Sequence, residues 1–226
     1  MGKYIIILAT PRTGSSFLNS LMKAYQIANC SEHQLNYNTT QYTKELLLDL
    51  RDKYIRRKNY PYYGMKILPH IFSKIDDCFG NIFNFLEASK ADVHFIYLYR
   101  HDFIQQIISY YMALETDYWI GKFEDKYYQK FSSLKFNIGK VNLLEKDLKN
   151  DIDNYLLFFN KFNISPCSIS YEELTKDSYA IIEKICNSFN ITIDKTIKPE
   201  NLFEKQQYPS EIYENLILQY RNYKSL

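Results

Sequence analysis

The feature that most constrains the fold is a strand pattern at residues 3–9, in which Tyr4 to Ala9 form a continuous, isoleucine-rich apolar run. A run of this kind is typical of a parallel strand that is buried on both faces of its sheet. A tight turn, Thr10-Pro11-Arg12-Thr13-Gly14, follows it directly. After Ser15 the apolar residues recur at helical spacing, at Phe17, Leu18, Leu21, Met22 and Tyr25. The sequence therefore predicts a strand, a tight loop and a helix, which form the first half of a βαβ crossover.

Further strands and helices alternate along the rest of the chain. Strand patterns lie at 62–68, 93–99 and 167–170, and helical patterns at 44–58, 82–90, 103–112, 144–159, 179–189 and 209–220. This alternation predicts an α/β fold, with a P-loop-type parallel sheet covered by helices on both faces. No repeat, low-complexity tract or Gly/Ser linker divides the sequence, so we expect residues 1–226 to form a single domain.

The net charge and the cysteine spacing argue against several classes of function for this sequence. The net charge is +2, from 28 basic and 26 acidic residues, which argues against a nucleic-acid or membrane-surface binder. Cys30, Cys78, Cys167 and Cys186 form no C-x-x-C pair, so we expect buried thiols and no bound metal. The longest apolar run is too short to span a bilayer. We therefore expect a cytoplasmic protein, and we leave open whether an N-terminal anchor precedes these residues.

The turn after the first strand suits an anion. Its backbone N–H groups and the following helix dipole favour negative charge, and Gly14 lets the backbone approach closely. Compared with the pattern G-x-x-x-x-G-K-[ST], Ala9 replaces the first Gly and Ser15 replaces the Lys, which weakens the case for metal-assisted phosphoryl transfer. Arg12 can supply a cation instead. The candidate phosphate-binding residues are Arg12, Thr13, Gly14, Ser15 and Ser16. An ordinary turn that caps a helix is the competing interpretation.

A second candidate anion site follows the strand at 93–99. Arg100 leaves the carboxyl end of that strand, the edge at which open α/β sheets bind ligands. Asp102 is positioned to cap the next helix, and Ser109 follows on that helix. A guanidinium and a hydroxyl there could hold a second phosphate. The alternatives are that Arg100 only pairs with Asp102 and that Ser109 is a solvated helix residue.

Taken in order, these motifs resemble the sulfotransferase family, and their details are similar to its bacterial trehalose sulfotransferase branch. The matching segments are Ala9-Thr10-x-Arg12-x-Gly14-Ser15, Gly64-x-Lys66, Arg100-x-Asp102 through Gln106, Ser109, Ala113 to Thr116 with Trp119, Tyr171-Glu172-x-Leu174, and Lys205-Gln206. The departures are Tyr155 where that branch tends to have Trp, no Pro ahead of Glu32, and a short chain. These departures affect the inference about the acceptor more than the inference about the donor.

The resemblance implies a donor, a reaction and partners. The first motif would hold the 5′-phosphosulfate of 3′-phosphoadenosine 5′-phosphosulfate (PAPS), and Arg100 with Ser109 the 3′-phosphate. We expect Lys205 to lie at the surface. The alternative is a contact with the cofactor, because basic residues in the C-terminal part of the family reach the cofactor. The sulfuryl group would pass by in-line displacement to a hydroxyl of a small molecule such as a sugar or glycolipid. The resemblance is also compatible with the formation of a homodimer.

Glu32 occupies the place of the proposed catalytic Glu of the trehalose branch, and the adjacent His33 is the alternative base. Two other functions stay open at this stage. One is a nucleotide kinase or hydrolase with a degenerate P-loop, which should require Mg²⁺ and prefer ATP. The other is a catalytically inactive PAPS-binding protein, which would bind the donor without forming product.

Overall fold

The structure is a computed structural model that describes residues 3–31, 43–52, 60–119, 125–194 and 209–225. The chain divides into two compact units. Unit 1 comprises Met1–Tyr99 and Phe158–Leu202, and unit 2 comprises Arg100–Leu157 and Phe203–Leu226.

Unit 1 contains a four-stranded parallel sheet in the order β2-β1-β3-β4. Its strands are β1 (Tyr4–Ala9), β2 (Tyr63–Ile67), β3 (Val93–Tyr99) and β4 (Cys167–Ser170). Ile7 of β1 lies beside Lys66 of β2 and Ile96 of β3, and Tyr99 pairs with Ser170. Because all the strands run in the same direction, their carboxyl ends meet at one edge of the sheet.

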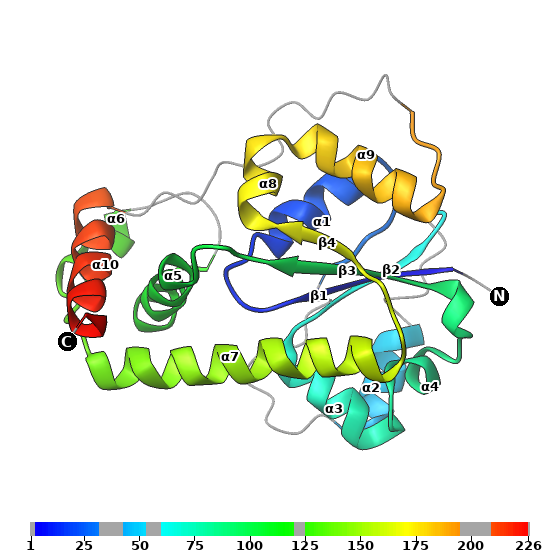
Figure 1. The fold of residues 1–226 in the computed structure, drawn as a ribbon, viewed down its shortest axis with the longest axis horizontal. Coiled ribbons are helices and arrows are strands. Elements are labelled where there is room, and N and C mark those ends of the chain that lie inside the picture. The colour runs from blue at the N-terminus through cyan, green and yellow to red at the C-terminus, as the bar shows by residue number, and fades with distance from the viewer. Residues whose placement is uncertain (1–2, 32–42, 53–59, 120–124, 195–208, 226) are drawn as a thin grey trace. The chain divides into compact units, whose positions relative to one another are not determined.

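Helices cover both faces of this sheet (Figure 1). On one face lie α1 (Ser15–Ala24), α8 (Tyr171–Lys176) and α9 (Ser178–Phe189), and on the other lie α2 (Lys44–Leu50), α3 (Pro69–Phe79) and α4 (Ile82–Leu86). Every residue of β1 is buried, and Ile5 and Ile7 pack with Leu18 of α1 in the core. On the opposite face the Phe95 and Phe83 rings lie 6.0 Å apart. The predicted α/β fold is confirmed.

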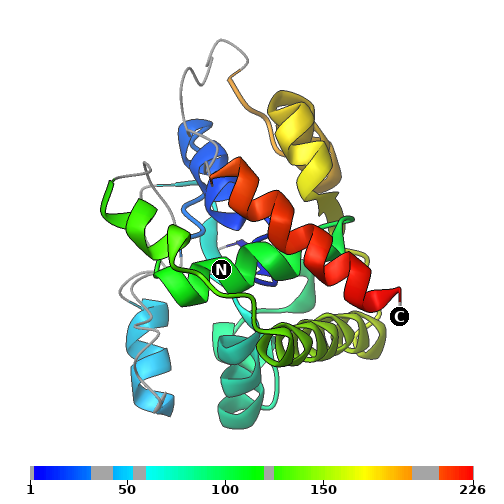
Figure 2. The same ribbon diagram turned by 90° about the vertical axis from the view of Figure 1, so that its left-hand side faces the viewer.

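Unit 2 is helical. It contains α5 (Phe103–Thr116), α6 (Asp125–Ser132), most of α7 (Ile138–Lys161) and α10 (Ser210–Lys224). Figure 2 shows α10, in red, packed across α5. Met112 of α5, Leu148 of α7 and Tyr220 of α10 share one buried core. Among the described residues, no helix combines the length and the apolar character needed to cross a membrane.

Three helices of the structure were not expected from the sequence. They are α3, α6 and α8. Helix α3 begins at Pro69, and a proline fits the first helical position because its missing N–H is not needed there. The helix predicted at 44–58 is observed over Lys44–Leu50, and residues 53–59 lie outside the described ranges.

All four cysteines lie among the described residues as free thiols. Cys30, Cys167 and Cys186 are buried, as the sequence predicts, whereas Cys78 is partly exposed. Burial raises the pKa of the Cys30 thiol to about 12, so this group stays protonated at neutral pH.

His94 lies on β3 in a largely aromatic setting. Its ring stacks on Phe189 with centroids 4.6 Å apart, and the Tyr62 ring meets it at 6.0 Å. Nε2 of His94 is buried and has no hydrogen-bond partner among the described residues. Burial lowers the pKa of His94 below its usual value, Lys3 lowers it further, and Asp92 acts in the opposite direction. The native state therefore binds a proton at His94 less readily than the unfolded chain does.

We expect the free energy of unfolding to fall as the pH drops below about 6.5, the usual pKa of histidine, because protonation then favours the unfolded chain. The stability is complete above that pH and is lost as the pH falls toward the lowered pKa of the native state. His94→Phe keeps an aromatic ring and removes the titration, so it should lose less stability than the wild type between about pH 7.5 and about pH 5.5. Urea unfolding at several pH values measures this, and equal losses in both proteins would contradict it.

Candidate functional site

The turn between β1 and α1 holds two residues in the left-handed backbone region. Arg12 has φ 68° and Gly14 has φ 84°. Between them the buried Thr13 donates its Oγ1 hydrogen to the carbonyl of Thr10 at 2.9 Å. Left-handed residues set among ordinary ones form concave nests of backbone N–H groups, which bind anions. A non-glycine residue such as Arg12 is strained in this region, and such strain gathers at functional sites.

The start of α1 is also suited to an anion. Gly14 is its N-cap residue and supplies no side-chain hydrogen bond, and the first turn contains no acidic residue. The first N–H groups of a helix have no partner within the helix, and the helix dipole makes this end positive. A phosphate or sulfate group fits such a helix end.

Gly14 is required here for a second reason, because α8 leaves no room for a side chain. A Cβ at this position would lie 2.9 Å from Cδ2 of Tyr171 and 3.3 Å from Cδ2 of Leu174. Tyr171 is itself fixed by a capping box, in which Ser170 and Glu173 exchange hydrogen bonds at the start of α8. In the sequence, Tyr171 and Leu174 are only part of a matching motif, whereas in the structure they limit the space at the turn.

Lys66 lies beside the same helix start. It stands on β2 with only 4% of its surface exposed, and its Nζ is 3.4 Å from Oγ of Ser16. A buried ammonium group is costly unless it interacts with polar or negative groups. No function is predicted for Lys66 from the sequence, although a lysine inside a short buried strand is a signal that could have identified it. Its position adds positive charge next to the predicted phosphate loop.

The second predicted anion site lies in unit 2. Nη2 of Arg100 donates a hydrogen bond to Oε1 of Gln105 at 2.8 Å. Asp102 is the N-cap of α5, as predicted, and accepts a hydrogen bond from the backbone N–H of Gln105 at 2.9 Å. Its other carboxylate oxygen lies 3.6 Å from the Arg221 guanidinium. The competing interpretation from the sequence is that Arg100 only pairs with Asp102. In the structure Arg100 is hydrogen-bonded to Gln105, and Asp102 lies near Arg221.

Ser109 and Gln106 lie inside unit 2. Their exposed fractions are 3% and 1%, so Ser109 is not the solvated helix residue that the sequence also allowed. A buried side-chain hydroxyl in a protein generally forms hydrogen bonds. A hydrogen bond from Ser109 to a phosphate stays a prediction.

The structure describes some of the predicted site residues and not others. Arg12, Thr13, Gly14, Ser15 and Ser16 come together in one turn of unit 1. Arg100 and Ser109 belong to unit 2. Glu32, His33 and Lys205 lie outside the described residues.

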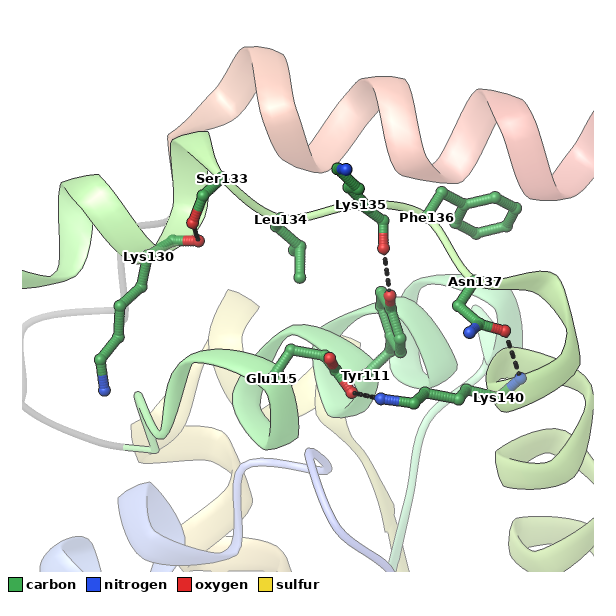
Figure 3. Close-up of a pocket in the computed structure, with 9 residues that line it drawn as sticks. All are labelled: Tyr111, Glu115, Lys130, Ser133, Leu134, Lys135, Phe136, Asn137 and Lys140. Carbon is green, nitrogen blue, oxygen red and sulfur yellow. Dashed lines mark hydrogen bonds and ion pairs between the residues drawn. The ribbon is translucent and has the colours of Figure 1, made fainter.

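A cavity of about 370 Å³ in unit 2 involves none of these residues (Figure 3). The Lys140 ammonium points to Glu115 at 2.8 Å, and the hydroxyl of Tyr111 donates to the carbonyl of Lys135 at 2.5 Å. Lys130 donates to the carbonyl of Thr116 at 2.9 Å. Lys130 and Lys140, which line the cavity, therefore both have hydrogen-bond partners within unit 2. Within the ranges described, no group of three or more His, Cys, Asp or Glu residues could hold a metal ion.

The parallel sheet and the tight turn between its first strand and α1 define an α/β protein of P-loop-like fold. Within this class the chain belongs to the Stf0 sulphotransferase family, whose model matches residues 68–221. The match covers Arg100 and Ser109 and begins after β2, so the turn at 10–14 lies outside it.

Two further similarities were found. The chain is 23% identical over 112 residues to a trehalose 2-sulfotransferase of Mycobacterium tuberculosis (strain ATCC 35801 / TMC 107 / Erdman). That alignment covers 50% of this chain and 40% of the relative, so the chain matches less than half of the relative's length. The structure is similar to the sulfotransferase domain of the Synechococcus PCC 7002 olefin synthase, with 13% identity and a TM-score of 0.43 over 96% of this chain and 94% of that domain.

Replacing Gly14 with alanine should destabilise the protein more than the same change at Gly80. Both glycines have positive φ, 84° and 75°, which costs an alanine about 1–2 kcal/mol. A Cβ at Gly80 would meet only Nδ2 of Asn84, at 4.0 Å, whereas at Gly14 the Tyr171 ring must move. Such overpacking adds about 1–3 kcal/mol. Urea unfolding of both variants measures the difference, and equal costs would show that the Tyr171 contact does not restrict this position.

Proposed function

We propose that the protein transfers the sulfuryl group of PAPS to a hydroxyl of a small acceptor. Membership of a sulfotransferase family supports the reaction class. The observation that carries the donor assignment is the turn before α1, where two left-handed residues, an uncapped helix start and the buried Lys66 favour an anion. We assign the 5′-phosphosulfate of PAPS to this turn, with Arg12, Thr13, Gly14, Ser15 and Ser16 as its binding residues.

In the proposed reaction the acceptor oxygen attacks sulfur as the bond from sulfur to the 5′-phosphate oxygen breaks. The products are a sulfate ester and adenosine 3′,5′-bisphosphate, and the acceptor's proton passes to a base. Negative charge builds on the leaving phosphate, so fixed cations and N–H groups near it lower the barrier. Arg12 and the N–H groups of the turn serve this purpose, and we add Lys66 to them because its ammonium lies 3.4 Å from Ser16.

We assign the 3′-phosphate of the donor to Arg100 and Ser109. An arginine binds a phosphate through two parallel N–H groups, and a hydroxyl can complete the set. One guanidinium nitrogen of Arg100 is held by Gln105, which fixes the orientation of the others. A contact from Lys205 to the donor stays a prediction from the resemblance.

We propose Glu32 as the base that accepts the acceptor's proton, with the adjacent His33 as the alternative. The resemblance supports Glu32, while histidine is the commoner base near neutral pH. The chain is anchored just before this pair, because Cys30 is buried and its N–H donates to Oδ1 of Asn19 on α1 at 2.7 Å. A fixed point so close in sequence suits a residue that must be placed accurately.

For the acceptor we propose a sugar or glycolipid. The support is the name of the relative, a trehalose 2-sulfotransferase, together with the motifs shared with that branch. A homodimer and a cytoplasmic location stay predictions. Membership of the sulfotransferase family disfavours a nucleotide kinase or hydrolase, and a catalytically inactive PAPS-binding protein is tested by the experiments below.

Calorimetry should show that adenosine 3′,5′-bisphosphate binds without Mg²⁺ and more tightly than ATP. Arg100→Ala should weaken this binding about ten- to hundredfold, because it removes charge-assisted hydrogen bonds to the 3′-phosphate. Lys74→Ala is a matched control that removes the same unit charge from an exposed pair with Asp77. A protein that bound only ATP with Mg²⁺ would overturn the donor assignment.

Glu32→Gln should lower kcat by about a hundredfold or more while leaving the affinity for adenosine 3′,5′-bisphosphate within about twofold, because a base acts only as the acceptor reacts. Transfer of labelled sulfate from PAPS to a panel of sugars measures kcat. His33→Gln is the matched variant at the next position. If His33→Gln lowers kcat and Glu32→Gln does not, the base is His33, and no product with any acceptor would indicate an inactive binding protein.

A further inference from the structure

Helix α10 contacts the residues that follow β3 at two points. The hydroxyl of Tyr213 donates to the carbonyl oxygen of Gln105 at 3.1 Å and lies 3.4 Å from its side-chain Oε1. That same Oε1 accepts the hydrogen bond from Nη2 of Arg100 at 2.8 Å. Tyr213, Gln105 and Arg100 therefore form a continuous chain of hydrogen bonds within unit 2.

The second contact is between charges. Arg221 lies on α10 two turns beyond Tyr213, and its guanidinium is 3.6 Å from the carboxylate of Asp102. Asp102 caps α5, but its negative charge opposes a phosphate at the same helix end. A cation from α10 offsets part of that charge while the cap remains in place.

The far end of α10 is anchored by a separate cluster. Glu145 of α7 accepts hydrogen bonds from Tyr220 at 2.7 Å and from Lys224 at 2.5 Å, and Lys149 lies 2.9 Å away. Burial alone would raise the pKa of Glu145, but these hydrogen bonds lower it to about 2. Glu145 is therefore ionised throughout the neutral range and holds α10 against α7.

We propose that Tyr213 is a positioning residue, which orients the Arg100 guanidinium through Gln105 and so sets the preference of the protein for a donor with a 3′-phosphate. This inference rests on the proposed function. An unrestrained arginine side chain loses much rotational freedom when it binds a phosphate, and prior orientation removes part of that cost. Tyr213 does not need to touch the donor in order to have this effect.

The test compares two nucleotides that differ only in the 3′-phosphate. Adenosine 3′,5′-bisphosphate is titrated by calorimetry, and adenosine 5′-monophosphate is measured by competition with it. Tyr213→Phe should lower the ratio of the two affinities about three- to tenfold, as expected for the loss of one hydrogen bond that orients a charged group. Binding of the monophosphate and the thermal unfolding midpoint should change little, whereas a general structural defect would weaken both nucleotides.

Tyr223→Phe is the matched control. It removes a hydroxyl from the same helix, where Tyr223 is 45% exposed and accepts a hydrogen bond from Asn142 at 3.2 Å. This variant should keep the affinity ratio of the wild type. Gln105→Met interrupts the same chain of hydrogen bonds by a different substitution and should also lower the ratio, so the test does not depend on one variant folding.

A double-mutant cycle then identifies the route of the effect. If Tyr213 acts through Arg100, Tyr213→Phe should cause no further loss of selectivity in a protein that already carries Arg100→Ala. An unchanged ratio in Tyr213→Phe, or an equal loss with and without Arg100, would overturn the inference and leave the donor assignment intact. A wild-type protein that does not distinguish the two nucleotides would overturn both.

Discussion

Between β1 and α1 the backbone turns within a few residues, and it can do so because Gly14 adopts a φ of 84° with the Tyr171 ring packed against it. Tyr171 is far from Gly14 in the sequence, and it is positioned by the capping box between β4 and α8. The shape of the turn therefore depends on the packing of α8 as well as on the local strand–turn–helix pattern. The local pattern provides the backbone N–H groups, and the Tyr171 ring restricts the residue that can occupy position 14.

The charges at the start of α1 differ from those around the cavity of unit 2. In unit 2 the carboxylate of Glu145 meets Lys149 and Lys224, and Lys140 of the cavity meets Glu115, so positive and negative groups are matched. At the start of α1 the first turn has no acidic residue, the dipole is positive, and the buried Lys66 ammonium lies close by. A positive helix end without an acidic residue in its first turn is favourable for a bound anion, and we therefore propose that the phosphosulfate binds there rather than in the cavity of unit 2.

The elements that were predicted from the sequence depend on local patterns. The apolar run of β1 and the cap at Asp102 are read from adjacent residues, and both are confirmed. Helix α8 has only six residues, too few for an apolar period to be recognised. The contacts of Tyr171 with Gly14 and of Tyr213 with Gln105 join segments far apart in the chain, so no local pattern could have predicted them. Glu32 lies outside the described residues, and the assignment of the base still depends on the resemblance.

The two ends of the proposed donor are supported by independent observations. Arg100, Ser109 and the α10 residues Tyr213 and Arg221 all lie within residues 68–221, the segment that matches the sulphotransferase family. The turn at 10–14 lies outside that segment, and its assignment comes from backbone conformation, the uncapped helix and Lys66. A donor with phosphate groups at both ends requires both features, whereas a simple phosphate or sulfate ion requires only one. The family match supports a sulfotransferase and the geometry of the turn supports an anion site, so two separate observations support the proposed donor.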